Sequence, residues 1–304
     1  MHQLDSLDDP GERRGTYYAL DVTVPNNPKF LFSLSSDRLI RYNGTSLETI
    51  TTASVLPKEL GESRSQPFIR PVEIDGVYTV ALFFGAGYDN NEDMRWGSTQ
   101  SFPLDAGNLA TSEILVIDGA TNEYNLPTSN DPENPYYADL GCGSGVAGAV
   151  CGQVNPRGRG LYVYELTREG SSPSLRDFSH TGEKIWAYTN GEHHSAADNH
   201  VIDNTMTFSL PADLKVVDVD QDGFPDRVYA ADTGGRVWRF LIGDADDNGT
   251  NLPSEWTGKI IFKSNPGSDS TNGRKFFYSP DYNVVDSNRV NLFISSGDRA
   301  HPLN

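Results

Sequence analysis

Cysteine, basic residues and long apolar runs are all scarce in this chain. Only two of its 304 residues are cysteines, and 24 Lys and Arg stand against 42 Asp and Glu, which gives a formal net charge of -18. A charge of that sign repels phosphate backbones, so it argues against nucleic acid as a partner and favours cations, divalent ones included. No apolar run approaches the roughly 18 residues that a membrane-spanning helix needs, so no membrane span is predicted.

The N-terminal segment also lacks the apolar core of a signal peptide. Its sequence, MHQLDSLDDPGERRG, is acidic and polar. A secretory signal would place an apolar stretch there. Two interpretations stay open: a cytosolic chain, or a piece of a longer exported protein.

The two cysteines, Cys142 and Cys151, lie in the stretch GCGSGVAGAVCG. Their spacing is not the Cys-x-x-Cys of metal sites, and two cysteines cannot fill a structural zinc site alone. Nothing bulky separates them, so a disulfide that closes a small loop is a candidate in an exported protein. In a reducing cytosol they are two unrelated small residues.

Glycine and proline are plentiful, with 29 and 18 residues, and mean hydropathy is -0.50. Hydrophobic residues still make up 37% of the chain, which is enough for a core. This mixture favours short strands joined by long polar loops over helices. An all-β fold is therefore predicted.

A repeat runs along the chain. The pattern Phe-x-x-Pro begins at Phe68, Phe208 and Phe277, with separations of 208 − 68 = 140 and 277 − 208 = 69 residues. After each copy comes an apolar strand, and a third and a fourth strand of the unit follow it. The apolar strands are expected at 80–89, 227–235 and 291–299. The third strands are expected at 17–21, 113–118, 161–165 and 236–240, and the fourth strands at 29–34, 184–189 and 259–264.

Four antiparallel strands per unit, packed radially, make a β-propeller. A β-sandwich is the alternative, but it does not explain the long period. We expect residues 1–304 to form an incomplete, quinoprotein-like propeller of four to five blades, with 127–200 as an insertion-rich blade within it. The strand aromatics are expected in the core between blades: Tyr17, Tyr18, Tyr162, Tyr164, Trp186 and Trp238.

An acidic loop lies between two strands in VVDVDQDGFPDRVYAAD, residues 216–232. Its carboxylates are Asp218, Asp220, Asp222 and Asp226. Carboxylates this close repel one another unless a cation neutralises them. An exposed turn that favours Asp and Gly accounts for two or three acids, but not for four in this register.

The spacing matches the first three quarters of an EF-hand loop, with Asp at positions 1, 3 and 5. Gly223 at position 6 permits a sharp turn, the carbonyl of Phe224 supplies an oxygen, and Asp226 closes the ring. Tyr229 stands where an EF-hand has its bidentate Glu. Ca²⁺ is predicted over Mg²⁺, which rarely occupies an all-protein cage. A closed hairpin of metal ligands leaves little room for a substrate, so no catalytic residue is predicted there.

A second acidic stretch, DADDNGTNLPSE, offers oxygen donors at Asp244, Asp246, Asn248, Thr250 and Glu255. It matches Asp-x-Asp-x-Asn-Gly-x5-Glu. Asn251 replaces the usual apolar residue, and Pro253 interrupts the loop. Calcium binding and an ordinary polar turn both remain open here.

Histidines cluster in GEHHSAADNH, which contains His193, His194 and His200. Zinc uses such residues. Adjacent histidines on a strand point to opposite faces, however, and the segment is polar. A solvated loop is the favoured interpretation.

Four stretches together resemble the C-terminal propeller of the PilY/PilC family of type IV pilus biogenesis and tip-adhesin proteins. They are GTYYALDVTVPNNPKFLFSL, ALFFGAGYDNNED, VVDVDQDGFPDRVYAADTGGRVWRF and LFISSGDRAHPLN. The acidic loop followed by DTGGRVWR is the most specific part, and residues 127–200 match least.

The resemblance implies an exported protein at the pilus tip, outer membrane or cell surface. Its implied partners are minor pilins, other pilus tip proteins, and a host or abiotic surface. Calcium would modulate pilus extension against retraction. The implied ligands are Asp218, Asp220, Asp222, the Phe224 carbonyl and Asp226.

Two other interpretations of the propeller's function remain. An integrin-type propeller also carries Asp-x-Asp-x-Asp-Gly-x-x-Asp repeats and binds proteins or glycans, but it usually has the loop in several blades. The strand at 114–123 resembles repeats of quinone-dependent dehydrogenase propellers, yet no vicinal cysteine pair or base is identifiable. We therefore expect a binding protein and not an enzyme.

Overall fold

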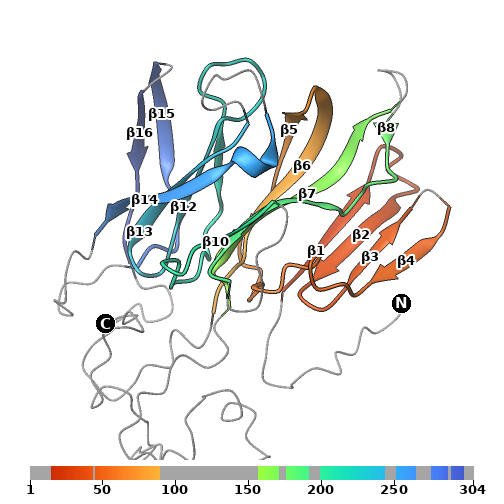
Figure 1. Ribbon diagram of the computed structural model, residues 1–304, viewed down its shortest axis with the longest axis horizontal. Helices are drawn as coiled ribbons and strands as arrows, with labels where there is room; N and C mark the ends of the chain where they lie inside the picture. The colour runs from red at the N-terminus through yellow and green to blue at the C-terminus, as the bar shows by residue number, and fades with distance from the viewer. Residues whose placement is uncertain are drawn as a thin grey trace, which may run out of the picture.

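Short strands make up about half of the part of the chain that the structure, a computed structural model, describes. That part comprises residues 15–43, 45–89, 157–170, 176–191, 199–243, 251–264, 275–286 and 289–297. Within it the strands form four sheets, and a single 3-10 turn, η3 (Pro253–Glu255), is the one helical element (Figure 1). No helix there is long and apolar enough to cross a membrane. The predicted all-β class is confirmed.

The first sheet is a meander of four antiparallel strands in chain order. Its strands are β1 (Thr16–Asp21), β2 (Lys29–Ser35), β3 (Leu39–Tyr42) and β4 (Leu47–Ile50). We expected β1 and β2 to be a third and a fourth strand, but they are the first two of this sheet. Two short polar turns extend it, and Asn43 Oδ1 fixes the second by accepting the N–H groups of Thr45 and Ser46, both at 3.0 Å. Strands as short as β3 and β4 leave no clear periodicity in the sequence.

The second sheet has six strands in the order β10-β9-β7-β6-β5, with β8 paired to β7. They are β5 (Phe68–Ile74), β6 (Val77–Gly85), β7 (Gly160–Glu169), β8 (Arg176–Asp177), β9 (Lys184–Thr189) and β10 (His200–Ile202). β6 pairs directly with β7, so the strand expected at 161–165 is the third strand here. The strand expected at 113–118 lies outside the described residues. β7 and β9 fall within 127–200 and are central strands of the sheet.

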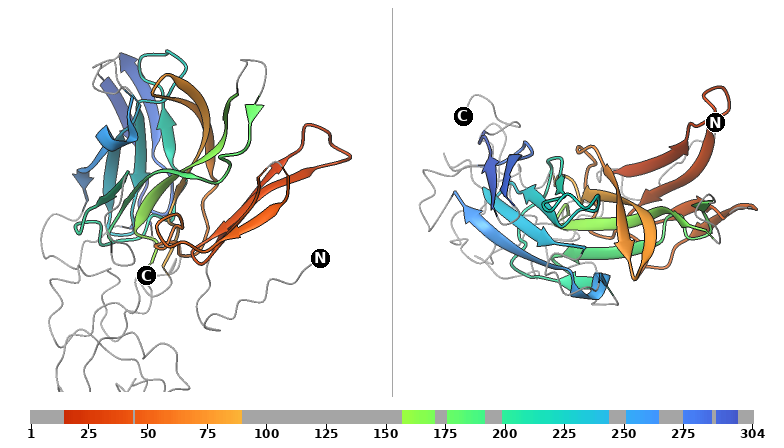
Figure 2. Two further views of the ribbon diagram at one scale, coloured as in Figure 1. Left: turned by 45° about the vertical axis from the view of Figure 1, so that its right-hand side comes forward. Right: turned by 90° about the horizontal axis from the view of Figure 1, so that it is seen from above.

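The third sheet follows the predicted blade, four antiparallel strands in chain order. It contains β11 (Lys215–Val217), β12 (Arg227–Ala231), β13 (Arg236–Leu241) and β14 (Thr257–Lys263). The hairpin of β15 (Asp281–Asp286) and β16 (Arg289–Phe293) forms the last sheet. Figure 2 shows the sheets succeeding one another across the molecule in chain order, from the N-terminal sheet in red to the C-terminal hairpin in dark blue.

Hydrophobic core fills the spaces between successive sheets. Phe32 and Phe84 belong to a cluster shared by the first two sheets, and Trp186 and Trp238 to one shared by the second and third. The predicted core aromatics are buried, with one exception: Tyr18 is 61% exposed. Neighbouring residues on a strand point to opposite faces, and Tyr17 takes the inner one.

Copies of the Phe-x-x-Pro pattern occupy different positions in their sheets. The first lies inside β5, where Pro71 is tolerated because β5 is an edge strand. The other two precede β11 and β15, with Phe208 and Phe277 buried. The pattern therefore marks the start of a sheet but not a fixed strand position.

Candidate metal centre

The acidic loop, residues 218–226, connects β11 to β12 at one end of the third sheet. The two strands pair antiparallel, with Val217 opposite Arg227, and the N–H of Asp226 donates to the carbonyl of Val217 at 2.9 Å. The loop therefore leaves and rejoins the sheet at one place. Val217 and Val219 are buried against Val284 of the last hairpin and its neighbours, which anchors the base of the loop.

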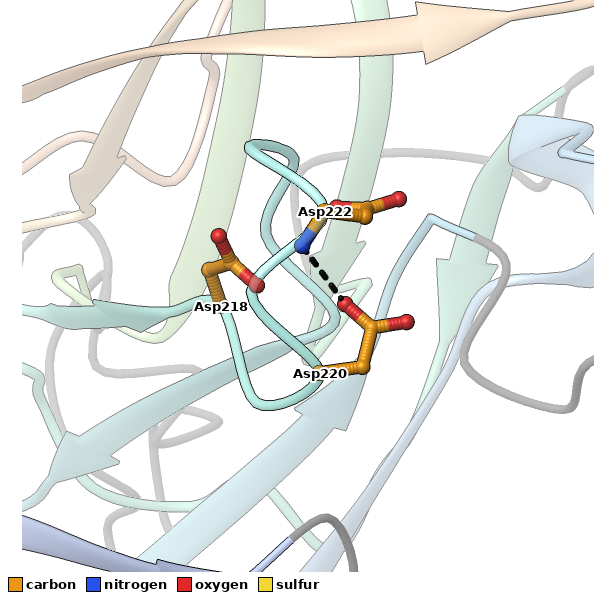
Figure 3. Close-up of side chains that lie close together, drawn as sticks. All are labelled: Asp218, Asp220 and Asp222. Carbon is orange, nitrogen blue, oxygen red and sulfur yellow. Dashed lines mark hydrogen bonds between the residues drawn. The ribbon is translucent and has the colours of Figure 1, made fainter.

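Three of the four predicted carboxylates converge. Oxygen atoms of Asp218, Asp220 and Asp222 all lie within 4.8 Å of one another. Figure 3 shows the three side chains arranged around one coil of the loop. Asp218 is partly buried, and the other two are exposed. Among the residues that the structure describes, no other group of three His, Cys, Asp or Glu side chains comes together in this way.

Backbone N–H groups hold these carboxylates in place. Asp218 accepts from Gln221 (Oδ1, 2.6 Å) and Gly223 (Oδ2, 3.0 Å). Asp220 Oδ1 accepts from the N–H of Asp222 at 3.1 Å, the dashed line in Figure 3, and Asp222 Oδ1 accepts from Phe224 at 2.7 Å. A carboxylate oxygen has more than one lone pair, so these bonds orient the oxygens and leave acceptor capacity for a cation.

The sharp turn expected at position 6 is present. Gly223 has φ +100°, and a Cβ built there would meet nothing within 4 Å, so its requirement is conformational. Gln221 also has a positive φ, 69°, a conformation that costs a residue with a side chain about 1–2 kcal/mol. The loop therefore carries one strained position beside its expected glycine.

Asp226, the fourth predicted carboxylate, lies outside the group of three. Its Oδ2 accepts from the N–H of Val219 at 2.5 Å, and the side chain is partly buried. Burial raises the pKa of this carboxyl and the negative charges of Asp220, Asp218 and Asp222 raise it further, while the Val219 N–H opposes them. The charges of the other three carboxylates therefore affect the pKa of Asp226, although its side chain lies outside their group.

The donor set fits a hard cation. Every side-chain donor in the group is a carboxylate oxygen, the type that Ca²⁺ and Mg²⁺ prefer. Zinc sites in proteins usually include Cys or His. Ca²⁺ takes six to eight oxygens, so the three carboxylates must be supplemented. Asp226 and the carbonyl of Phe224 are the additions that the loop spacing predicts, and they stay predictions.

The second acidic stretch is outside the described residues from 244 to 250, which leaves out Asp244, Asp246, Asn248 and Thr250. Glu255 is described and lies exposed in η3. Cys142 and Cys151 are also outside the described residues. Metal binding at 244–255 and the disulfide stay predictions.

His200 corrects the expectation of a solvated loop, while His193 and His194 lie outside the described residues. His200 begins β10 and is 5% exposed, with Nε2 at 2.9 Å from the hydroxyl of Thr189. Burial lowers its pKa to about 4, and Lys184 adds to the effect. The parallel pairing of β10 with β9 buries it, a contact that local polarity did not indicate.

Asp232 is a residue to which the sequence assigned no role. It is fully buried at the other end of β12. Its Oδ1 accepts from the N–H of Arg236 at 2.9 Å, and its Oδ2 accepts from Trp238 Nε1 at 2.8 Å. The signal was an Asp before Thr-Gly-Gly with a Trp six residues on.

Comparison with protein families and with curated proteins found no match to this sequence. Among solved structures, the C-terminal domain of Pseudomonas aeruginosa PilY1 is similar, at 14% sequence identity and a TM-score of 0.45. The match covers 94% of this chain and 39% of that one, so this chain spans well under half of the structure it matches. At these values the metal centre has to be interpreted from its own residues.

Proposed function

We propose that this chain is part of a calcium-binding β-propeller in a type IV pilus tip or assembly protein, and that it binds and assembles without catalysis. The observation that carries the proposal is the acidic loop. Three carboxylates at alternate positions converge within 4.8 Å, around a positive-φ glycine, between two paired strands. The same loop, followed by DTGGRVWR, is the most specific part of the resemblance to pilus tip proteins.

Calcium would supply charge neutralisation and would bind the loop oxygens together. The chain's own residues do the rest. Asp218, held by two N–H groups at the half-buried start of the loop, orients the site. Asp220 and Asp222 remain exposed, so a cation reaches them from solvent. Without it, the carboxylates repel one another and the β11–β12 connection loosens.

Thermal unfolding with Ca²⁺, and with Mg²⁺ as the matched control, tests the metal. A ligand that binds only the folded state stabilises it by about 2.7 kcal/mol at 100 times its Kd. The expected result is a wild-type midpoint that rises with Ca²⁺ and rises less with Mg²⁺, whereas the midpoint of Asp220→Ala should rise with Ca²⁺ by less than that of wild type. Asp213→Ala, which removes an exposed carboxylate before β11, is the control variant and should respond like wild type. An equal response of the two variants would contradict the assignment.

The pilus role is tested in the cells that make the protein. Deletion of the gene is expected to reduce surface pili and surface attachment, and the wild-type gene should restore both. The gene with Asp220→Ala should restore them incompletely, because extension and retraction are proposed to depend on the calcium loop. Unchanged pili after deletion would reject the pilus role and leave a calcium-binding propeller of the integrin-repeat type as the alternative.

A further inference from the structure

Phe224 links the acidic loop to the neighbouring sheet. Its ring lies edge-on to the ring of Tyr78 in β6, with 6.0 Å between centroids and 65° between planes. Arg176 of β8 places its Cζ 4.7 Å from the centre of the same Tyr78 ring. The three residues come from the third sheet, from β6 and from β8, and we call them the Phe224–Tyr78–Arg176 bridge.

A second attachment joins the third sheet to the same place. The β5–β6 turn, residues 73–78, contains Asp75, whose N–H donates to the carbonyl of Asn251 at 3.3 Å. The side-chain amide of Asn251 donates to the carbonyl of Glu73, and its oxygen accepts from Trp256 Nε1 at 3.1 Å. Trp256 is buried in the core shared by the two sheets, so this attachment is rigid at its base.

The two attachments differ in what lies behind them. Asn251 is backed by the core through Trp256, whereas Phe224 belongs to a loop of exposed carboxylates. Phe224, at position 7 of the loop, also has two roles. Its backbone carbonyl is a predicted ligand of the cation, and its side chain contacts Tyr78. A rearrangement of the loop therefore moves a contact of the β5–β6 turn that Trp256 and the core do not fix.

We propose that Phe224 transmits the occupancy of the acidic loop to the β5–β6 turn and β8 of the neighbouring sheet. The inference rests on the proposed function, because it names what calcium in this loop regulates. When the carboxylates are drawn together, the Phe224 ring is held against Tyr78 and the turn becomes less mobile. When they repel, the ring is released and the turn exchanges more freely with solvent. Through the Phe224–Tyr78–Arg176 bridge, a change of charge in the acidic loop thus changes the mobility of the β5–β6 turn on the neighbouring sheet.

Hydrogen–deuterium exchange of the whole chain, with Ca²⁺ and with Mg²⁺, tests this. An aromatic pair stabilises by about 0.5–1.5 kcal/mol, which corresponds to about 2- to 13-fold in an equilibrium constant. In wild type, Ca²⁺ is expected to slow exchange in residues 218–226 and, by about that factor, in residues 73–78. Mg²⁺ should do less at both places.

Tyr78→Ala separates binding from transmission because it removes the bridge from the side of the β5–β6 turn and changes no residue of the acidic loop. In this variant Ca²⁺ should still slow exchange in the loop but not in residues 73–78. Tyr78→Phe keeps the ring and is the matched control, with wild-type behaviour expected. Phe224→Ala, with Phe224→Tyr as its control, removes the ring on the loop side, and Ca²⁺ should again fail to slow exchange in residues 73–78.

The outcomes are distinct. Protection of the loop without protection of the turn in wild type overturns the inference and leaves the proposed calcium site intact. Protection of the turn that persists in both alanine variants also overturns it, since the bridge would then be unnecessary. Absence of any calcium effect on the loop, with no binding by calorimetry, overturns the proposed function and the inference together.

Discussion

The turns at the two ends of β12 both combine aspartate with glycine, and they differ in how the carboxylates are satisfied. At one end, Asp232 is fully buried and its two oxygens accept from Arg236 and Trp238 within the protein. At the other end, Asp220 and Asp222 are exposed and share a loop with two further carboxylates. Both oxygens of the Asp232 carboxylate accept within the protein, whereas Asp220 and Asp222 each accept one backbone N–H and face solvent.

The difference shows what an Asp-Gly turn does in each setting. A single buried carboxylate with short bonds to neutral donors is a structural element, since removing it leaves buried donors unpaired. A group of carboxylates within 4.8 Å, held by backbone N–H groups and open to solvent, has acceptor capacity that the protein does not use. We therefore expect the Asp232 turn to contribute stability and the acidic loop to bind a cation.

The largest expected effect is on the Asp232 turn. Asp232→Ala should lower the free energy of unfolding by about 3 kcal/mol, because two hydrogen bonds to a charged group are lost and the Trp238 N–H is left buried without them. Asp222→Ala, measured without calcium, should change it by less than about 1 kcal/mol because that side chain is exposed. Urea unfolding of the two variants measures both. Similar losses of unfolding free energy in the two variants would contradict the assignment of different roles to the two turns.

A second experiment compares how much Ca²⁺ stabilises variants at the two ends of β12. Saturating Ca²⁺ should stabilise the Asp232→Asn variant by the same amount as wild type, about 2.7 kcal/mol at 100 times Kd. It should stabilise Asp220→Ala by less, about 1.4 kcal/mol or below at the same Ca²⁺ concentration, because the methyl group supplies neither charge nor an oxygen to the cation. Denaturant midpoints with and without Ca²⁺ give the four values. Loss of the calcium effect in Asp232→Asn would mean that the two turns act as one unit.

Backbone strain provides a smaller contrast of opposite sign. Gly235 in the Asp232 turn and Gln221 in the acidic loop both have positive φ, 74° and 69°. Gly235→Ala should destabilise by about 1 kcal/mol, and Gln221→Gly should stabilise by up to about 1 kcal/mol, since glycine adopts this conformation without a Cβ penalty. Thermal midpoints of the two variants in calcium-free buffer check the signs. A destabilised Gln221→Gly variant would show that the Gln221 side chain stabilises the loop by more than its backbone strain costs.

The smallest effect concerns Asp226 and depends on pH. Because its pKa is raised in the folded protein, its ionised form costs stability at pH values above that pKa, and the cost disappears as pH falls through it. In calcium-free buffer, Asp226→Asn should therefore be more stable than wild type near neutral pH, by less than about 1 kcal/mol for a partly solvated group. The gain should shrink toward acidic pH. A gain that grows on acidification would reverse the assigned direction.

Local pattern was sufficient where strands are regular and the ligands lie close in sequence. The β11–β14 meander and the convergence of Asp218, Asp220 and Asp222 were both predicted from spacing, because a tight hairpin brings alternate positions of its loop together. Asp226 was predicted as a fourth ligand; its Oδ2 accepts from the N–H of Val219, its side chain lies outside the group of three, and its part in cation binding stays a prediction. Spacing alone does not show which donor a side chain will choose.

Contacts between distant segments account for the remaining differences. His200 is buried because β10 pairs in parallel with β9, and the role of Asp232 depends on a Trp across a turn. β3 and β4 are too short to show a period, so the first two strands were assigned the wrong places in their sheet. The Phe224–Tyr78 contact joins residues on two sheets, and nothing in the local sequence of either one indicates it.

Calorimetric titration of the whole chain with Ca²⁺, beside Asp220→Ala and with Mg²⁺ as control, is the decisive measurement for calcium binding by the acidic loop. We predict a saturable, calcium-selective site in wild type that Asp220→Ala weakens by at least about tenfold, or about 1.4 kcal/mol of binding free energy. A second saturable site would assign a metal to the stretch at 244–255 as well. A folded wild-type chain that releases or absorbs no heat of calcium binding, or an Asp220→Ala variant with wild-type affinity, would contradict calcium binding by the acidic loop.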